Sequence, residues 1–446
     1  MAAKHILTLI SDFVCGYPLF VWLIGGGLFL FIYSGAVPLR RLRQAVHSLR
    51  IVQQGEGQIT SFQALMSAIS STVGMGNIAG VAIAIVMGGP GAIFWMWVSA
   101  LVGMGTKFFE GTLAIMYKGK DNLGNTQGGP MYIICNGLGK KWKPLAVFFC
   151  LVGMIGCLCV MQANQLTESL ITVFATPMGY SDTVGLRSAI GIVMGIIVGA
   201  VVLGGIQRIS RLATKIVPVM VGSYLLLVLY IILTHLTEIP QLFLHIIHEA
   251  FNLRAGFGAL AGVAIVGARR AMYVNEAGVG TASLMHGASR NSEPVREGLV
   301  AMLGPAIDSG LVCTLTAIPI LLAGNYHVEG VKGLYVALNA FQTLLPGCGH
   351  YLLMVIIFFF AFSTMFSYSY YGMKCFGYLF GMDRTRYYNY FYLAMIVVSC
   401  IISLNTVVVV MDLAFALMSI PTMLAILLLA PRVKAQMANY FARHPH

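Results

Sequence analysis

The sequence predicts an all-α integral membrane protein with about eleven transmembrane helices. Of the 446 residues, 58% are hydrophobic and only 9% are charged, and the apolar residues form runs long enough to cross a bilayer. A soluble domain carries roughly 25% charged residues, so this chain has too few charges to coat a soluble protein of its size. The composition excludes a soluble enzyme, a secreted disulfide scaffold and a disordered chain.

A spanning helix needs roughly 20 mostly apolar residues, and eleven segments approach or exceed this length. They are residues 17–38, 62–87, 92–117, 145–174, 189–206, 216–234, 256–273, 299–323, 351–371, 388–402 and 407–430. The first run is too long for a cleavable signal peptide and is interpreted as the first spanning helix. The loops are too short for a soluble domain, so we expect one membrane domain.

The positive charges predict the orientation in the membrane. If the loop after the first span is cytoplasmic, 20 of the 27 Lys and Arg residues lie in cytoplasmic loops, and only Lys4, Arg187, Arg254 and Lys332 lie outside. Cytoplasmic loops of membrane proteins are enriched in Lys and Arg. The sequence therefore predicts an external N-terminus and a cytoplasmic C-terminus, and the same enrichment explains the net charge of +12 without a nucleic acid partner.

The segment after the first span has the pattern of a helix on the membrane surface. Leu39, Leu42, Val46 and Leu49 recur at spacings of three and four residues among several arginines. This period predicts a basic amphipathic helix on the cytoplasmic lipid leaflet, and a solvated linker is the alternative.

The second span contains three glycines in seven residues, flanked by polar residues. Non-helical backbone is tolerated in a membrane only where it lines a cavity or is buried in protein. A break at 74–76 would leave free carbonyls from Ser70 to Val73, which suit a cation, and free N–H groups near Asn77, which suit a carboxylate. An amino-acid zwitterion with Na⁺ matches both poles, whereas close helix packing through Gly76 and Gly80 is the alternative.

The seventh span is also irregular, because Gly267 lies near its middle and two arginines follow it. We expect a second break there. Each broken helix is then the first of a set of five spans. The two sets enter from opposite sides of the membrane, as inverted repeats require. The expected organisation is an N-terminal helix with the amphipathic helix at 1–59, two five-helix repeats at 60–235 and 236–432, and a cytoplasmic tail at 433–446.

Two other spans carry polar side chains. Ser363 and Thr364 in the ninth span are neutral oxygen donors of the kind a hard cation prefers, and Tyr368 lies one turn beyond Thr364 on the same helix face. Hydroxyls bonded to their own helix are the alternative. In the fourth span, Gln162, Asn164 and Gln165 are amides that either bind substrate or bond neighbouring helices.

Four acids lie in or near the spans: Glu110, Glu168, Asp308 and Asp412. Intramembrane carboxylates are functional by default, although each can pair with a nearby cation, as Glu110 can with Lys107 three residues earlier. None of the four lies in a predicted break. This favours a cation site made of carbonyls, hydroxyls and the substrate's own carboxylate.

Several ordered motifs resemble the alanine or glycine:cation symporter family across nearly the whole chain. They are GMGNIAGVA at 74–82, GGPGAIFWMW at 88–97, GGPMY at 128–132, QAN at 162–164, NEAG at 275–278, FST at 362–364 and SYYG at 369–372. The resemblance implies a LeuT-type fold with one extra N-terminal helix. It also implies Na⁺- or H⁺-coupled uptake of alanine or glycine across the bacterial inner membrane.

The resemblance further implies two sets of site residues. The substrate pocket would be formed by Gly74, Gly76, Asn77, Gln162, Gly267, Thr364, Met365 and Tyr368. The Na⁺ site would use the carbonyls of Ser70, Val73 and Phe360 with the hydroxyls of Ser363 and Thr364. Two departures bear on substrate size and stereochemistry: Tyr368 stands where the family commonly has Trp, and Tyr273-Val274 where it has Phe-Ser.

Other functions have weaker support in the sequence. A channel would need a filter repeated in a symmetric oligomer, and no filter-like repeat is evident. A membrane enzyme would need a catalytic constellation; His245 and His248 form a conceivable metal pair, but an interfacial helix explains them better. Cys157 and Cys159 are interpreted as small helix residues. We expect Na⁺ as the coupling ion, no organic cofactor, contacts with membrane lipid, and no obligate protein partner.

Overall fold

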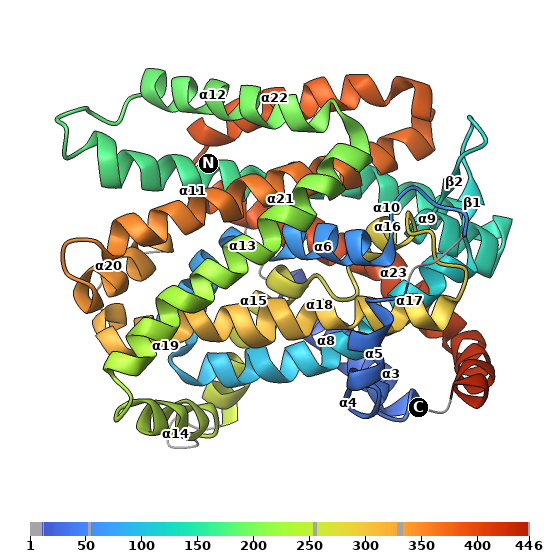
Figure 1. Ribbon diagram of the computed structural model, residues 1–446, viewed down its shortest axis with the longest axis horizontal. Coiled ribbons are helices and arrows are strands. Elements are labelled where there is room, and N and C mark those ends of the chain that lie inside the picture. The colour runs from blue at the N-terminus through green and yellow to red at the C-terminus, as the bar shows by residue number, and fades with distance from the viewer. Residues whose placement is uncertain (1–10, 12, 52–54, 253–256, 328–332, 445–446) are drawn as a thin grey trace.

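The computed structural model describes residue 11 and residues 13–51, 55–252, 257–327 and 333–444, and these form layers of helices with one short β-hairpin (Figure 1). Within these residues, seven helices are long and apolar enough to cross a membrane, or eight if one bent pair counts as a span. All eleven predicted spans fall on helical segments, but the number eleven stays a prediction. Lys4, Arg254 and Lys332, three of the four charges predicted outside, lie beyond the described residues.

The N-terminal part forms a helix with a π-helical turn, followed by two short helices. The elements are α2 (Tyr17–Phe20), η1 (Val21–Gly25), α3 (Gly26–Tyr33), α4 (Val37–Arg40) and α5 (Leu42–Ser48). Leu39, Leu42 and Val46 are exposed, whereas Ala45 is buried. Leu49 is half-buried against the core. The segment therefore has the helical structure and most of the outward apolar face predicted for the membrane-surface helix.

The second predicted span is a broken helix, as expected from its glycines. It consists of α6 (Ser61–Thr72), the π-helical turn η2 (Gly76–Gly80) and α7 (Val81–Gly88), and its two halves meet at a bend of 52°. A capping box starts α6, because Thr60 and Gln63 each bond the other's backbone N–H. The helix ends at Thr72, since Val73 is extended with φ −78° and ψ 95°.

The chain then continues to the sixth span through helices and one hairpin. The elements are α8 (Gly91–Met116), β1 (Gly119–Lys120), β2 (Thr126–Gln127), α9 (Pro130–Tyr132), η3 (Ile133–Leu138), η4 (Lys140–Trp142), α10 (Lys143–Gly156), α11 (Val160–Leu170), η5 (Ile171–Ala175), α12 (Val184–Val202) and α13 (Gly205–Thr234). The strands are antiparallel and pair Gly119 with Gln127 and Lys120 with Thr126. Cys159 is left-handed (φ 53°) and separates α10 from α11.

The second break lies elsewhere than predicted. After α14 (Ile239–Ala250), helix α15 (Phe257–Asn275) runs without interruption through Gly267, and α16 (Thr281–His286) follows. Glu276 has φ 52°, and Gly278 and Gly280 also have positive φ. The prediction of a break at Gly267 is wrong, because a single glycine is tolerated inside a packed helix. The left-handed residues after Asn275 end the helix instead.

The remaining chain forms the second half of the molecule. Its elements are α17 (Pro294–Ala301), α18 (Leu303–Pro305), the π-helical segment η7 (Ala306–Val312), α19 (Cys313–Ala323), η8 (Asn325–His327), α20 (Leu334–Leu344), α21 (Gly349–Phe380), η9 (Met382–Arg384), α22 (Thr385–Ile401) and α23 (Leu404–Arg443). Helix α8 packs against α15, α16, α17 and η7, while α6 packs against α13 and α21. These contacts bring both breaks close to α8 and α21.

Candidate functional site

The first break is stabilised from within by Asn77. Its side-chain oxygen Oδ1 accepts a hydrogen bond from the Gly74 N–H at 2.8 Å, and its own N–H donates to the Gly74 carbonyl at 3.1 Å. The Asn77 Nδ2 group donates to the backbone carbonyl of Asp308 at 3.1 Å. Asn77 is fully buried, so this side chain holds the break open and anchors it to η7.

Helix α21 presents the predicted hydroxyl pair to this break. Ser363 and Thr364 donate from their hydroxyls to the Phe360 carbonyl at 3.0 and 2.9 Å. A Cβ added at Gly74 would lie 2.3 Å from Thr364 Oγ1 and 3.6 Å from the Phe360 carbonyl oxygen. Only a glycine therefore allows the broken backbone to approach the hydroxyls so closely.

The end of α6 is tied to the same turn of α21. Ser70 donates through Oγ to the Ser363 carbonyl at 2.8 Å and accepts from Ser367 Oγ at 3.0 Å. The five predicted cation ligands, Ser70, Val73, Phe360, Ser363 and Thr364, are all buried at this contact between the two helices. They offer neutral carbonyl and hydroxyl oxygens, which suit a hard monovalent cation. In this structure the hydroxyls bond their own helix, as the alternative interpretation predicted.

Tyr368 faces the second break rather than open space. Its hydroxyl donates to one carboxylate oxygen of Glu276, and Thr281 Oγ1 donates to the other. The Tyr368 ring stacks on Phe415 of α23 at 6.5 Å between centroids. A buried Tyr hydroxyl needs a hydrogen-bond partner, and for Tyr368 that partner is Glu276.

Glu276 is not among the site residues predicted from the sequence. None of the four acids named there lies in a predicted break, but Glu276 is buried at the centre of the second break that the structure contains. The conclusion failed because the break was placed at Gly267. The signal was present in the NEAG motif at 275–278 and the two residues after it, where Glu276 precedes Gly278 and Gly280.

The two breaks approach each other. The atoms nearest to a Cβ added at Gly76 belong to Val274 (3.6 Å) and Tyr273 (3.7 Å), at the end of α15. Glu110 of α8 accepts a hydrogen bond from the Gly278 N–H at 2.6 Å. The described residues include no Lys107–Glu110 contact within ion-pair distance, so the carboxylate of Glu110 serves the second break instead.

The sequence profile of the sodium:alanine symporter family matches residues 1–446. The chain belongs to this family. The sodium/alanine symporter AgcS of Methanococcus maripaludis is 37% identical over 434 residues, covering 95% of this chain and 94% of AgcS. An uncharacterized transporter of Haemophilus influenzae is 36% identical over 452 residues, covering 99% of this chain and 97% of the relative.

The crystal structure of MhsT in complex with L-phenylalanine has the same fold. It superposes with a TM-score of 0.61 at 15% sequence identity and covers 83% of this chain and 89% of MhsT. MhsT is a LeuT-fold transporter, which confirms the LeuT-type fold that the motif resemblance implied, while the extra N-terminal helix stays a prediction. Family members are transporters, so this family member is a transporter and not an enzyme.

Three further predicted substrate residues of this symporter family member lie in different surroundings. Met365 is buried, and its carbonyl accepts from Tyr392 OH at 2.6 Å. Gln162 is buried, and its Oε1 has no hydrogen-bond partner among the described residues. Gly267 packs against α8, since an added Cβ would lie 2.5 Å from the Ala92 carbonyl oxygen. Their roles in substrate binding stay predictions.

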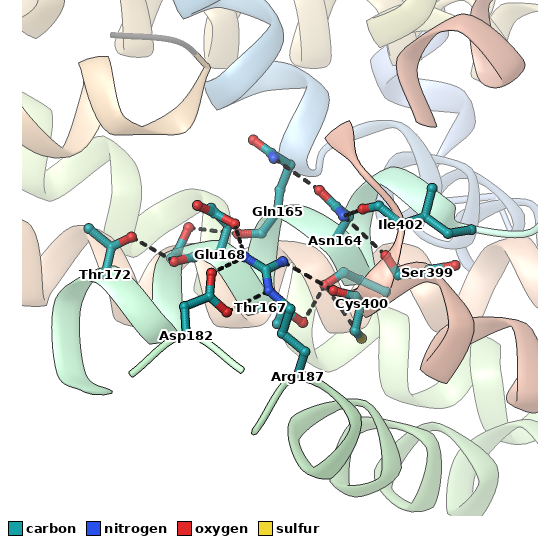
Figure 2. Close-up of polar contacts among 12 residues, drawn as sticks. Asn164, Gln165, Thr167, Glu168, Thr172, Asp182, Arg187, Ser399, Cys400 and Ile402 are labelled. Atoms are coloured by element: carbon teal, nitrogen blue, oxygen red, sulfur yellow. Dashed lines mark hydrogen bonds and ion pairs between the residues drawn. The ribbon is translucent and has the colours of Figure 1, made fainter. Parts of the chain in front are cut away.

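Asn164 and Glu168 of the transporter serve contacts between helices. Asn164 donates to the carbonyls of Ser399 and Ile402 at 3.1 and 2.6 Å, where α22 gives way to α23 (Figure 2). Nearby, Arg187 pairs with Glu168 at 2.7 Å and with Asp182 at 2.6 Å. The hydrogen bond from Arg187 lowers the pKa of Asp182.

Asp412 on α23 likewise pairs with a cation, Arg269 of α15, at 2.6 Å. Asn164, Glu168 and Asp412 therefore follow the structural alternatives. Asp308 differs, because its carbonyl holds Asn77 while its Oδ2 is buried without a partner among the described residues.

Proposed function

We propose that this protein is a secondary active symporter that takes up alanine, and other small neutral amino acids such as glycine, together with Na⁺. The bacterial inner membrane is the proposed location, with the N-terminus outside and the C-terminus in the cytoplasm. One observation carries the proposal: a broken helix, held open by Asn77, faces a buried hydroxyl pair on α21.

The polarity of the break supports binding of a zwitterion. Half-helix α6 ends near Val73 with carbonyls directed at the break, which favours a cation there. The following turn begins with N–H groups near Asn77, which favours a carboxylate. An amino acid and Na⁺ can therefore occupy one buried site, in which the carboxylate partly neutralises the ion. The relative AgcS, named as a sodium/alanine symporter, supports this choice of substrate and ion.

The energetics are adequate for accumulation. One Na⁺ moving down 100 mV supplies about 2.3 kcal/mol, and a tenfold Na⁺ gradient adds about 1.4 kcal/mol. At one Na⁺ per substrate, these together support accumulation of several hundred-fold.

Uptake of labelled alanine into proteoliposomes tests the proposal. We expect saturable uptake that requires an inward Na⁺ gradient and is lost in Asn77→Ala, because the break loses both its internal bond and its anchor on Asp308. Asn339→Ala, a partly exposed asparagine of α20, is the matched control and should transport normally. Wild-type uptake by well-folded Asn77→Ala protein would contradict the proposed role of the break.

Proton-coupled uptake of the same substrates is a second candidate. The observation that favours it is the set of buried carboxyl groups next to the two breaks, Asp308 beside Asn77 and Glu276 beside Tyr368. Alanine uptake driven by a pH gradient without Na⁺ would select this candidate. Uptake that follows the Na⁺ gradient alone would reject it.

A further inference from the structure

The start of half-helix α6 is fastened by a buried network far from the transport site. Glu297 of α17 accepts hydrogen bonds through Oε2 from Ser61 Oγ (2.5 Å), Ser289 Oγ (2.9 Å) and Asn291 Nδ2 (2.9 Å). Its other oxygen, Oε1, lies 2.6 Å from His286 Nδ1. We refer to Ser61, His286, Ser289, Asn291 and Glu297 as the α6 latch.

The latch is enclosed by protein. Glu297 and Ser289 have no exposed surface, and the other three residues are at most 5% exposed. A carboxylate removed from water is costly unless several donors replace the water. The latch supplies these donors, so the contact between α6 and α17 contains a buried carboxylate whose oxygens are hydrogen-bonded.

Backbone contacts hold the segment before α6 in the same place. The Arg290 N–H donates to the Ile59 carbonyl at 2.7 Å, and the Gln58 N–H donates to the Ala288 carbonyl at 2.8 Å. A Cβ added at Gly57 would lie 2.4 Å from the Ser289 carbonyl oxygen. The entry to α6 and the loop between α16 and α17 are therefore in direct contact.

The latch and the transport site are the two ends of one short helix. Helix α6 has 12 residues and is about 18 Å long at 1.5 Å per residue. Ser61 is its first residue, while Ser70 near its far end bonds α21 beside the cation ligands. Movement of α6 away from the α16–α17 loop would therefore separate the latch and uncover the first break from this end.

Three of the four hydrogen-bond donors to Glu297 lie outside α6, so α6 can separate from Glu297 without them. His286, Ser289 and Asn291 lie on the same side of the contact as Glu297, in α16 and the loop before α17. When Ser61 departs, three donors stay with the carboxylate and no charge is stranded. Opening therefore breaks the charge-assisted bond of Ser61 to Glu297 and the longer contacts of Ser61 Oγ with Ser289 Oγ (3.2 Å) and Asn291 Nδ2 (3.4 Å). It also separates the backbone bonds beside them and the two carbonyls, of Glu56 and Ser289, that Lys118 Nζ bridges at 2.8 and 2.6 Å.

We propose that Glu297 is a positioning residue that holds half-helix α6 shut, and that its bond to Ser61 breaks and re-forms once in each transport cycle. The inference rests on the proposed symport function. That the opening faces the cytoplasm rests on the proposed cytoplasmic position of the start of α6.

Thiol labelling of the full chain in inside-out membrane vesicles tests the latch without using substrate. The probe is Ser67→Cys, because Ser67 lies on α6 between latch and break and is fully buried. Cys135 and Cys348, the two cysteines that are not buried, are replaced by serine in every sample. We expect Glu297→Gln to raise the rate of labelling by a membrane-impermeant maleimide at least tenfold.

Two further variants make the result specific. Ser61→Ala removes the hydroxyl that α6 contributes to the bond with Glu297 and leaves Glu297 its other donors. It should raise the labelling rate about threefold. If Glu297→Gln does not fold, this variant tests the inference alone. Glu293→Gln is the control, since Glu293 precedes α17 and pairs with Arg443 at 3.3 Å without contacting α6. It should leave the labelling rate unchanged.

The kinetics of uptake give a second readout. Glu297→Gln should raise the apparent KM for external alanine, because more molecules face the cytoplasm, while a merely destabilised protein would lose Vmax alone. Unchanged labelling in folded Glu297→Gln or Ser61→Ala protein, equal acceleration by Glu293→Gln, or equal acceleration from the external side would overturn the inference. Loss of the proposed symport is a separate result, seen as absent Na⁺-dependent uptake by the parent chain.

Discussion

Replacing Gly74 by alanine tests the contact on which the proposed cation site depends. The new Cβ would lie 2.3 Å from Thr364 Oγ1 and 3.4 Å from Thr364 Cβ, so either the broken backbone or Thr364 must move. Overpacking of this kind costs about 1–3 kcal/mol. If that cost falls on the ion-bound state, the apparent Na⁺ affinity should drop roughly five- to 150-fold.

Na⁺ dependence of alanine uptake in proteoliposomes measures this effect, with thermal unfolding as a check on folding. Gly222→Ala is the matched control, because nothing lies within 4 Å of an added Cβ at that position in α13. It should leave both measurements near wild type. Wild-type Na⁺ affinity in Gly74→Ala, or an equal loss in Gly222→Ala, would refute the reasoning.

A double variant separates the steric effect from the loss of a ligand. Gly74→Ala combined with Thr364→Ala removes the oxygen that the new methyl group meets, so thermal stability should recover. Na⁺ affinity should stay low, because the Thr364 hydroxyl is a proposed ligand. Stability that remains as low as in Gly74→Ala alone would show that the strain lies elsewhere.

Three further predictions follow from the site and the outer surface. Ser363→Ala with Thr364→Ala should weaken apparent Na⁺ affinity by about 1 kcal/mol or more for each lost oxygen, measured as Na⁺-dependent uptake; unchanged affinity would argue against a Na⁺ site there. Tyr368→Trp should shift preference toward glycine by roughly 1–3 kcal/mol, and coinciding inhibition profiles with unlabelled glycine, alanine, serine and leucine would remove Tyr368 from the pocket. The hydrogen bond from Arg187 lowers the pKa of Asp182. The ionised Asp182 should therefore stabilise the fold at neutral pH and lose this contribution as the pH falls below about 4. The thermal unfolding temperatures of wild type and Asp182→Asn should differ at pH 7 and converge at low pH.

The helical segments of the membrane domain and the first break could be predicted from the sequence because their causes are local. Long apolar runs with few charges form spanning helices wherever they lie in the chain. Three glycines among hydroxyl residues weaken a helix through backbone entropy and side-chain competition, which need no distant partner. The structure confirms that α6 ends at Thr72 and that Asn77 lies just beyond the break.

The second break was decided by tertiary contacts. Gly267 weakens α15 locally, but packing against α8 keeps the helix intact there. Glu276 is left-handed although it is not a glycine, and its carboxylate is held by Tyr368 and Thr281 while Glu110 bonds the Gly278 N–H. The strain of that backbone is offset by side chains up to 168 residues distant in sequence. Such contacts cannot be predicted from the composition of the chain or from the spacing of its apolar residues.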